Sequence, residues 1–347
     1  SPLLYQLSYQ ARLRATDWTI LGTARQSDDA ARKGQGGVSE EAIEVWYCYA
    51  GFPRSRELLR ERLAGTRFRF RAADPARPLE EQVGAASVLI PSMARITRSV
   101  IEAAPRLKLV VQFGAGLEGV DREFAAARGI AVRNVPGANA QAVAELAVFL
   151  MLALALRLPL HGKSFASQVV GDPVGSQLQG KTLGIVGLGA SGRALARIAR
   201  GFGMEVIAIR QTGAPDPLAS WVGGPGDLPR LLEGADYVSL HAPASPETRG
   251  LIGERELAAM RPHALLINVG RGPLVYRSAL IEALGERRIG GAGLDMFWEE
   301  PPDPKDPLFA LDNVVTTPHV GGVTEEALTR IADRVVSIIE EALTLPV

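Results

Sequence analysis

Three short segments in the second half of the chain carry residues that could hold and reduce a small organic acid. They are NVGRG at 268–272, GLDMFWEEPP at 293–302 and TPHVGG at 317–322, and each comes at the end of a run expected to be a β-strand. Together they supply an arginine, a glutamate and a histidine. A glycine-rich GLGASG segment lies upstream at 187–192. These are the parts required to move a hydride between a nicotinamide and an anionic 2-hydroxy or 2-oxo acid.

The chemistry of such a reaction sets the residue types that it needs. Oxidation of a 2-hydroxy acid removes a hydride from carbon and a proton from the hydroxyl group. The proton requires a group that titrates near neutral pH, which is the range of histidine. The substrate carboxylate requires a cation in fixed geometry, and a carboxylate beside the imidazole would stabilise its protonated form. One Arg, one His and one Asp or Glu at the same edge of a parallel sheet therefore indicate such a site.

The GLGASG segment has the pattern of a loop that binds the phosphates of a dinucleotide. An apolar run precedes it and a helix-length segment follows, which is the context that the pattern requires. We expect Gly187 to permit the tight turn, Gly189 to let the backbone approach a pyrophosphate, and Gly192 to allow close packing of helix on strand. The amides of Ala190 and Ser191 would then point at the phosphates from a helix N-terminus.

The end of the second strand of that unit bears on the choice of cofactor. A site that prefers NAD usually has an acidic residue there, which binds the ribose 2′-hydroxyl. This chain has Arg210, Gln211 and Thr212 at that point and, on this reading, no carboxylate nearby. Because a guanidinium can pair with a 2′-phosphate through two hydrogen bonds, the sequence favours NADP over NAD.

Short β-rich runs alternate with helical segments through most of the chain, which predicts parallel sheets with crossover helices. The expected strands of a first unit are EVWYCYA, SVLIP, LKLVVQF and IAVRNV, with an amphipathic helix at 54–63. The expected strands of a second unit are TLGIVG, EVIAI, YVSLHAP, ALLINVG, GAGLDMF and NVVTTPH. We therefore expect an α/β protein with two Rossmann-like, doubly wound parallel-sheet domains.

Two long helical segments are expected to connect and complete these domains. The first, at about 140–158, is too broadly apolar for a solvated helix and is expected between the domains. The second, at 325–343, is expected to fold back onto the first domain, which makes that domain discontinuous. The expected division is a disordered lead or targeting remnant at 1–40, a substrate domain at 41–138 plus 319–347, and a dinucleotide-binding domain at 139–318.

Composition and charge narrow the classes of partner. The 38 Lys and Arg residues balance 38 Asp and Glu residues without a basic tract, so nucleic acid is not expected as a partner. The longest apolar run, at 146–156, is too short to span a bilayer, so no membrane contact is expected. No Cys/His or carboxylate cluster has metal-ligand spacing, so no metal is expected. The single Cys48 fits a reducing compartment, which favours a soluble, cytoplasmic protein, with a plastid or mitochondrion as the alternative.

A series of motifs in a fixed order makes the sequence similar to one known family. They are FGAGLEGVD (113–121), GLGASG (187–192), SLHAPASPET (239–248), INVGRGPLV (267–275), GLDMFWEEP (293–301) and TPHVGG (317–322). Their residues and order resemble the D-isomer-specific 2-hydroxyacid dehydrogenases, the family of D-3-phosphoglycerate, hydroxypyruvate/glyoxylate and formate dehydrogenases. The likeness covers about residues 44–347.

The resemblance implies a catalytic set of three side chains. Arg271 matches the arginine that anchors the substrate carboxylate and polarises the carbonyl, and His319 matches the acid/base. The carboxylate paired with that histidine comes immediately before a proline and five residues after a strand-end Asp. The strand-end Asp here is Asp295, so Glu300 matches and its neighbour Glu299 does not.

The resemblance also implies the groups that hold substrate and cofactor. The turn at Ala115 and Gly116 is similar to a backbone-amide cradle for the substrate carboxylate, and Asp295 matches a residue near the nicotinamide carboxamide. The other residues that it implies on the cofactor side are His241, Ala242, Pro243, Thr248, Val269, Gly270, His319 and Gly321.

These features predict an NAD(P)H-dependent reductase of short 2-oxo acids, which oxidises D-2-hydroxy acids in the reverse direction. By likeness, hydroxypyruvate or glyoxylate is the expected substrate, and the bulky Trp298 is expected to shape the acyl pocket. The alternatives are a phosphoglycerate dehydrogenase-like enzyme and a dinucleotide-sensing, corepressor-like binding protein. The apolar linker-helix region also predicts a two-fold homodimer, as in the family.

Overall fold

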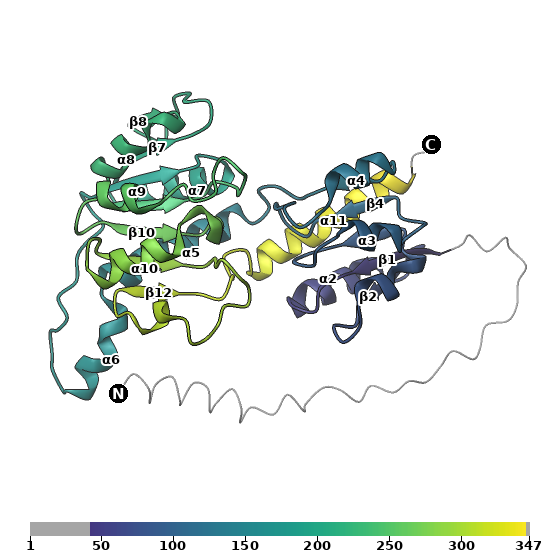
Figure 1. Cartoon of the computed structure of the whole chain (residues 1–347), viewed down its shortest axis with the longest axis horizontal. Helices are drawn as coiled ribbons and strands as arrows, with labels where there is room; N and C mark the ends of the chain where they lie inside the picture. The colour runs from purple at the N-terminus through teal and green to yellow at the C-terminus, as the bar shows by residue number, and fades with distance from the viewer. Residues whose placement is uncertain (1–41, 345–347) are drawn as a thin grey trace, which may run out of the picture.

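The computed structural model describes residues 42–344, which form two α/β lobes (Figure 1). The lead predicted at 1–40 lies outside these residues. Each lobe is built on a sheet whose strands are all parallel. Parallel neighbours need crossover connections, which explains the regular alternation of strands and helices along the chain.

The first lobe has a five-stranded sheet in the order β2-β1-β3-β4-β5. Its strands are β1 (Ile43–Tyr47), β2 (Phe68–Ala72), β3 (Val88–Ile90), β4 (Leu109–Val111) and β5 (Ala131–Arg133). The predicted strands are all present, but the prediction missed β2. This strand, FRFRA, lies at the edge of the sheet, and its alternating arginines leave little apolar signal.

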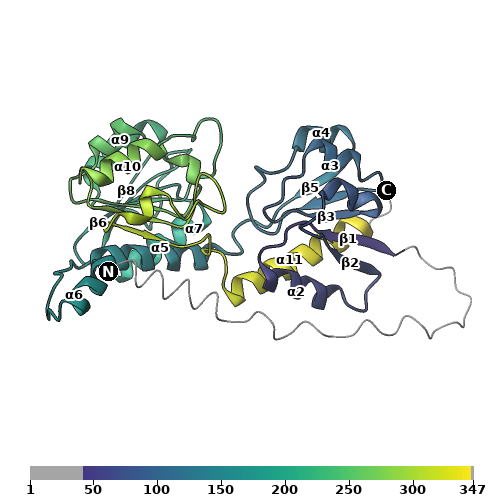
Figure 2. The same cartoon turned by 60° about the horizontal axis from the view of Figure 1, so that its bottom comes forward.

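Helices cover both faces of this sheet (Figure 2). α2 (Pro53–Leu63) and α11 (Glu325–Thr344) pack on one face, and α3 (Arg98–Glu102) and α4 (Arg122–Ala127) pack on the other. Val88 and Ile90 of β3 face α11, whereas Leu89 between them faces α3, as the alternation of a strand requires. The final helix therefore returns to the first lobe, as predicted, and the domain is discontinuous.

The second lobe has a seven-stranded sheet in the order β12-β11-β10-β9-β6-β7-β8. Its strands are β6 (Thr182–Val186), β7 (Glu205–Ile209), β8 (Trp221–Gly223), β9 (Tyr237–Leu240), β10 (Leu265–Asn268), β11 (Gly291–Leu294) and β12 (Val314–Thr316). The prediction missed β8, a three-residue strand at the edge of the sheet. The strand order reverses between β6 and β9, and the carboxyl ends of strands at such a point form a ligand crevice.

Helices also cover both faces of the second sheet. α5 (Ala140–Ala155) and α7 (Ala190–Gly201) pack on one face, and α8 (Leu228–Gly234), α9 (Glu254–Ala259) and α10 (Arg277–Gly285) pack on the other. Short 3₁₀ turns are present at Leu79–Glu81, Val83–Ala85, Pro225–Asp227, Gly272–Leu274 and Pro307–Ala310.

The long helix predicted at about 140–158 is α5, which ends at Ala155, and a second helix that was not predicted, α6 (Leu158–Ala166), follows it. They separate at Arg157, which has a φ of 54°, and Pro159 in the first turn of α6 cannot continue the bonding of α5. Nor does α5 simply lie between the lobes, because Leu150 and Leu154 are part of the core of the second lobe. Within the described residues no single helix is long and apolar enough to cross a bilayer, and α5 and α6 reach that length only together, across a bend of 42°.

Candidate active site

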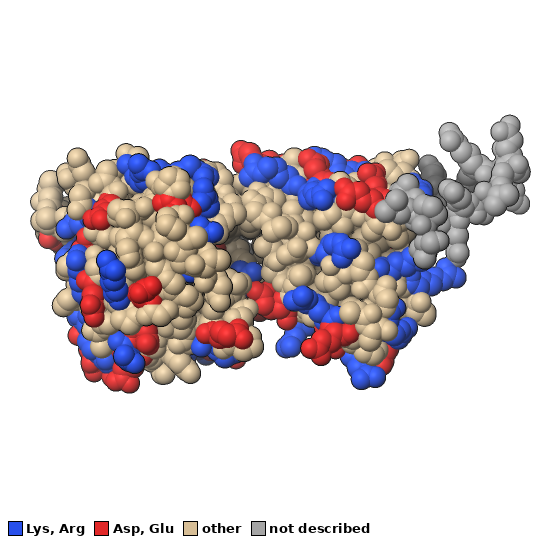
Figure 3. All heavy atoms as spheres, turned by 90° about the horizontal axis from the view of Figure 1, so that it is seen from above, with Lys and Arg blue, Asp and Glu red and all other residues tan. Residues whose placement is uncertain are grey.

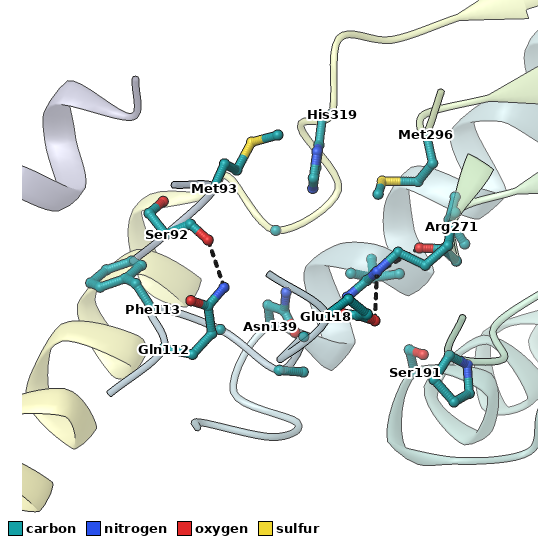
Figure 4. A pocket seen from close by; sticks show the side chains of 18 of the residues that line it. Ser92, Met93, Gln112, Phe113, Glu118, Asn139, Ser191, Arg271, Met296 and His319 are labelled. Carbon is teal, nitrogen blue, oxygen red and sulfur yellow. Dashed lines mark hydrogen bonds and ion pairs between the residues drawn. The ribbon is translucent and has the colours of Figure 1, made fainter. Parts of the chain in front are cut away.

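A cavity of about 570 Å³ lies between the two lobes, where strands of both sheets end. Figure 3 shows the hollow between the lobes, and Figure 4 shows side chains that line it. The predicted site residues on its wall are Ala115, Gly116, Gly189, Ala190, Ser191, His241, Ala242, Pro243, Val269, Gly270, Arg271, Glu300 and His319. Segments that are far apart in the sequence therefore meet in one place.

The other predicted residues do not line this cavity. They are Gly187, Gly192, Arg210, Gln211, Thr212, Thr248, Asp295 and Gly321. Arg210 to Thr212 follow β7, further along the sheet. The hydroxyl of Thr248 donates to the carbonyl oxygen of Pro243 at 2.7 Å, so Thr248 supports the loop that carries His241 to Pro243. A direct contact between Thr248 and the cofactor stays a prediction.

The three glycines of the GLGASG loop have different surroundings. Gly187 has a φ of 101°, and a Cβ added there would lie 2.7 Å from the amide nitrogen of Ala242. A Cβ on Gly192 would collide with the carbonyl oxygen of Gly187, so helix α7 packs directly on the turn. A Cβ on Gly189 would meet nothing within 4 Å. The loop thus leaves open space at Gly189, in front of the N-terminus of α7, where a pyrophosphate would fit.

His241 lies against this loop. Its Nδ1 is 3.0 Å from the hydroxyl of Ser191, and its Nε2 is 3.0 Å from the hydroxyl of Ser239. Burial lowers the pKa of His241 to about 4, so the ring is neutral at physiological pH. A neutral ring is suited to holding Ser191 in place, whereas a charged one would have to be desolvated in the cleft.

The sequence analysis predicted no carboxylate near Arg210 at the end of β7. This prediction is wrong. Asp216 is buried, and its Oδ2 is 3.7 Å from Nη1 of Arg210. The same oxygen forms an ion pair with Arg193, in the first turn of α7. One carboxylate thus faces two guanidinium groups, and the cluster keeps a net positive charge.

His319 and Glu300 form a hydrogen bond at the cavity wall, and the imidazole points into the cavity (Figure 4). Nδ1 of His319 lies 2.6 Å from Oε2 of Glu300, and Oε1 of Glu300 accepts a 3.1 Å hydrogen bond from the amide of Phe297. Burial raises the pKa of Glu300, but the hydrogen bond and charge of His319 and the Phe297 amide together bring it below the ordinary 4.5. Glu300 is therefore ionised at neutral pH.

The loop that carries His319 is held from beneath by Asp295. Its Oδ1 accepts hydrogen bonds from the Thr317 hydroxyl at 2.6 Å and the Val320 amide at 2.8 Å, and its Oδ2 accepts one from the Gly321 amide at 2.9 Å. His319 itself has a φ of 55°, which is uncommon for a residue with a Cβ. Asp295 is buried and fixes this strained loop, and its predicted contact with the nicotinamide stays a prediction.

Arg271 follows β10 and extends toward the first lobe (Figure 4). Its Nη1 donates to the carbonyl oxygen of Gly270 at 2.7 Å, and its Nε donates to Oε1 of Glu118 at 3.2 Å. A Cβ added at Gly116 would collide with both Nη2 of Arg271 and Oε2 of Glu118. The predicted carboxylate cradle at Ala115 and Gly116 thus lies directly beside the Arg271 guanidinium.

Sequence reasoning missed several groups on the cavity wall. Glu118 belongs to the FGAGLEGVD motif, and an ionisable side chain two residues after Gly116 was a signal that could have found it. Met93 and Phe52 lie in segments without a motif, so nothing in the sequence pointed to them. The Phe52 ring packs edge-on against the imidazole of His319 at 6.1 Å between centroids, which joins the two lobes beside the ion pair.

A phosphate loop and an Arg, Glu and His set in one interdomain cleft define a class of dinucleotide-dependent oxidoreductase. Residues 148–321 match the family described as D-isomer specific 2-hydroxyacid dehydrogenase, NAD binding domain. The chain belongs to the D-isomer-specific 2-hydroxyacid dehydrogenases, oxidoreductases that use a nicotinamide cofactor. The resemblance seen in the motifs is confirmed.

Curated relatives carry two kinds of name. A glyoxylate reductase from Thermococcus litoralis is 41% identical over 273 residues, which cover 76% of this chain and 82% of the relative. A D-3-phosphoglycerate dehydrogenase from Methanocaldococcus jannaschii is 41% identical over 257 residues, which cover 72% of this chain and 48% of the relative. The matched part is thus about half of the phosphoglycerate dehydrogenase.

Solved structures share the fold. The TT0316 protein from Thermus thermophilus has a TM-score of 0.76 at 36% identity, covering 87% of this chain and 97% of its own. An NADPH-dependent glyoxylate/hydroxypyruvate reductase from Sinorhizobium meliloti, solved with NADP and malonate, has a TM-score of 0.74 at 29% identity. That match covers 86% of this chain and 93% of the reductase. The prediction of two parallel-sheet α/β domains is confirmed.

Proposed function

We propose that this protein reduces short 2-oxo acids to D-2-hydroxy acids with NADPH, and that glyoxylate or hydroxypyruvate is its substrate. The observation that carries the proposal is the His319–Glu300 pair in the same cavity as Arg271 and the GLGASG loop. A glyoxylate reductase relative at 41% identity and a structural neighbour named as a glyoxylate/hydroxypyruvate reductase support the substrate class.

The residues of the second lobe fit a nicotinamide dinucleotide. The open space at Gly189 admits a pyrophosphate, and the first amides of α7, at Ala190 and Ser191, would donate hydrogen bonds to it. Val269 and Gly270 on the cavity wall would border the nicotinamide, close to Arg271 and His319. When bound, the reduced cofactor supplies the hydride, and the protein supplies the proton and the orientation.

The acid would be held by its carboxylate. The Arg271 guanidinium can form two parallel hydrogen bonds with a carboxylate, and the amides of the Ala115–Gly116 turn lie beside it. The 2-oxo group would then face His319. The side chains of Arg271 and His319 are 32% and 33% exposed, so closure of the lobes over the acid would exclude water before transfer.

His319 would supply the proton. Because Glu300 is bonded to Nδ1, the other ring nitrogen, Nε2, is the donor toward the carbonyl oxygen of the substrate. During reduction Nε2 gives its proton to that oxygen, and the imidazolium becomes neutral imidazole. In the reverse direction Nε2 accepts the hydroxyl proton. The ionised Glu300 stabilises the imidazolium in both directions.

The cluster at the end of β7 supports the proposed preference for NADP. Arg193 and Arg210 converge on the single carboxylate of Asp216, so a positive charge remains to pair with a 2′-phosphate. Asp216 also orients the two guanidinium groups, since both contact the same oxygen. A ribose 2′-hydroxyl would gain less from these arginines than a phosphate would.

The test is a rate screen of two cofactors against several acids, followed through the near-ultraviolet absorbance of the reduced nicotinamide. Wild-type protein should turn over glyoxylate or hydroxypyruvate with a higher kcat/KM for NADPH than for NADH. Arg210→Asp should shift that ratio toward NADH by at least about tenfold, because a charged hydrogen bond contributes roughly 1.5–3 kcal/mol. Absence of turnover with every acid would refute the function, and an unchanged ratio would refute the role of Arg210.

A phosphoglycerate dehydrogenase activity is the second candidate. The relative from Methanocaldococcus jannaschii, at 41% identity over 72% of this chain, favours it. The two candidates differ in the charge of their substrates, because phosphohydroxypyruvate carries a phosphate that glyoxylate and hydroxypyruvate lack. Comparison of these acids in the same screen distinguishes them.

We also propose that the chain divides into a substrate domain at 41–138 plus 319–347 and a dinucleotide-binding domain at 139–318.

We further propose that the protein forms a homodimer through the α5–α6 region. Large apolar side chains are exposed there, with Phe165 at 83% and Leu156 at 51%. Burial of such a patch against a second copy would remove it from water. Sedimentation of the protein as a monomer at micromolar concentration would contradict the dimer.

A further inference from the structure

Glu118 bridges the two lobes within the active-site cavity. It lies in the loop after β4 of the first lobe, and its Oε1 accepts the 3.2 Å hydrogen bond from Nε of Arg271 in the second lobe. Figure 4 shows the two side chains meeting inside the cavity. The side chains of Glu118 and Arg271 are 42% and 32% exposed, so this ion pair is open to displacement by a competing anion.

The position of the Glu118 carboxylate coincides with the proposed place of the substrate carboxylate. Its Oε2 lies directly over Gly116, where an added Cβ would collide with it, and Nη2 of Arg271 lies at the same point. Arg271 and the amides of the Ala115–Gly116 turn are the groups proposed to hold the acid. A substrate carboxylate that binds Arg271 therefore has to displace the Glu118 carboxylate.

The described wall of the cavity offers a second anionic group no lysine or arginine besides Arg271. Among the described residues that line the cavity, Arg271 is the one lysine or arginine. Two carboxylates, Glu118 and Glu300, share the same wall, and Glu300 is bonded to His319 at 2.6 Å. Met93 and Met296 lie on the two sides of His319 (Figure 4), and the polar residues of the wall, such as Ser92, Gln112 and Asn139, carry no charge.

We infer that Glu118 is a specificity residue that restricts this site to 2-oxo acids with a single negative charge. This inference rests on the proposed function and narrows it to monoanionic acids such as glyoxylate and hydroxypyruvate. Glu118 acts in two ways. It competes with every substrate for Arg271, and it repels a second phosphate or carboxylate on the substrate.

The repulsion is large enough to decide between substrates. A second anionic group on an acid held at Arg271 remains within the same small cavity as Glu118. Two like charges roughly 8 Å apart at an effective dielectric constant of about 20 repel by an amount that, after a discount for the 42% exposure of Glu118, corresponds to about a tenfold change in binding. Competition between Glu118 and the substrate carboxylate for Arg271 also weakens binding. This weakening is smaller, and it is the same for acids with one or with two negative charges.

The experiment compares wild-type protein with Glu118→Gln, which keeps the shape and the acceptor oxygen but removes the charge. Glu123→Gln is the matched control, because Glu123 is an exposed glutamate in the first turn of α4, outside the cavity wall. The monoanionic probes are glyoxylate and hydroxypyruvate, and the probes with additional charge are oxaloacetate and 3-phosphohydroxypyruvate. The kcat/KM of each acid is measured at low and at high salt, with the thermal unfolding midpoint as a check of folding.

Wild type should prefer the monoanionic probes. In Glu118→Gln the KM for glyoxylate should fall a few-fold with little change in kcat, and kcat/KM for the probes with additional charge should rise about tenfold more than for glyoxylate. This gain should shrink at high salt, because screening weakens the repulsion. Glu123→Gln should behave as wild type. If Glu118→Gln lowers the unfolding midpoint, Glu118→Ser repeats the test with a smaller side chain.

Each contrary result has a separate meaning. Wild-type preference for the more highly charged acids, or an equal gain for both classes in Glu118→Gln, would overturn the role of Glu118 and leave the reductase activity standing. A rise in the KM for glyoxylate would also overturn it, because Glu118 would then be assisting the substrate. Absence of turnover by wild type with every acid would overturn the proposed function, and the inference with it.

Discussion

At the scale of single residues, the imidazole of His319 is placed by contacts on three sides. Glu300 is bonded to Nδ1, and Phe52 packs against the ring. Asp295 accepts hydrogen bonds from the Thr317 hydroxyl before the residue and from two backbone amides after it. The left-handed conformation of His319 persists because these contacts hold the loop. A ring fixed in this way can present one defined nitrogen to a substrate.

We predict that His319→Ala lowers kcat by a factor of about 10²–10⁴, the usual contribution of a positioned acid/base, while cofactor affinity stays unchanged. Glu300→Gln should cause a smaller loss, because a neutral amide can still orient the ring but no longer stabilises the imidazolium. Steady-state kinetics together with titration of cofactor fluorescence would check both variants. Near-normal turnover of His319→Ala would exclude the acid/base role.

At the scale of elements, the glycines of the β6–α7 turn have two different roles. Two of them allow close packing of the backbone, and one borders the space proposed for a phosphate. Gly187 and Gly192 have no room for a side chain, since backbone atoms lie against them, whereas the space beside Gly189 is open. The same short segment therefore joins strand to helix tightly and leaves one side accessible to a phosphate. This division explains why a glycine-rich pattern followed by a helix is informative.

The glycines can be told apart by matched alanine substitutions. Gly192→Ala should lower the free energy of unfolding by about 2 kcal/mol or more, because the added methyl group collides with backbone. Gly189→Ala should leave stability within about 0.5 kcal/mol of wild type but weaken cofactor binding about tenfold or more, because the methyl group fills the phosphate space. Urea unfolding and cofactor titration measure the two effects. Equal stability of the two variants would contradict this packing.

At the scale of the whole molecule, the candidate active site lies where the two lobes face each other. Arg271, Glu300 and His319 come from the second lobe and its last connection, while Glu118, Phe52 and the Ala115–Gly116 turn come from the first. α11 ties the end of the chain back to the first sheet, so the connection that carries His319 crosses from one lobe to the other. Movement of the lobes would therefore change the distance between the acid and the proton donor.

The stability of the molecule should depend on pH through His241. The folded protein keeps this residue neutral down to about pH 4, whereas the unfolded chain binds a proton as pH falls through about 6.5. The unfolded state binds more protons in that window, so the free energy of unfolding should decrease as pH falls from about 6.5 toward about 4. Because His241 is partly open to the cavity, we expect a loss on the order of 1–3 kcal/mol.

Urea unfolding at a series of pH values would measure this effect. A His241→Gln variant lacks the titrating group, so its unfolding free energy should decline less steeply over the same range. Parallel pH dependence of the variant and wild type would show that another group is responsible.

Several parts of the fold could be predicted from the sequence because the signal is local. Buried parallel strands have apolar residues on both faces, so runs such as LGIV and LLIN stand out from the helices between them. The edge strands β2 and β8 were not predicted, because β2 has two arginines among its five residues and the apolar run of β8 is two residues long. The helix α6 was missed because none of its residues is buried, so it has no apolar face packed on a core.

The sequence by itself determined the alternating parallel architecture, and it predicted the phosphate loop and the set of Arg271, Glu300 and His319, because each prediction depends on residue types over a few neighbouring positions. Only the tertiary structure decided which charged side chains lie together as ion pairs. Asp216 joins Arg193 and Arg210 by the packing of a loop on α7, and Glu118 reaches Arg271 across 153 positions of the chain. Such pairs arise where separate elements converge, and no local pattern records that convergence.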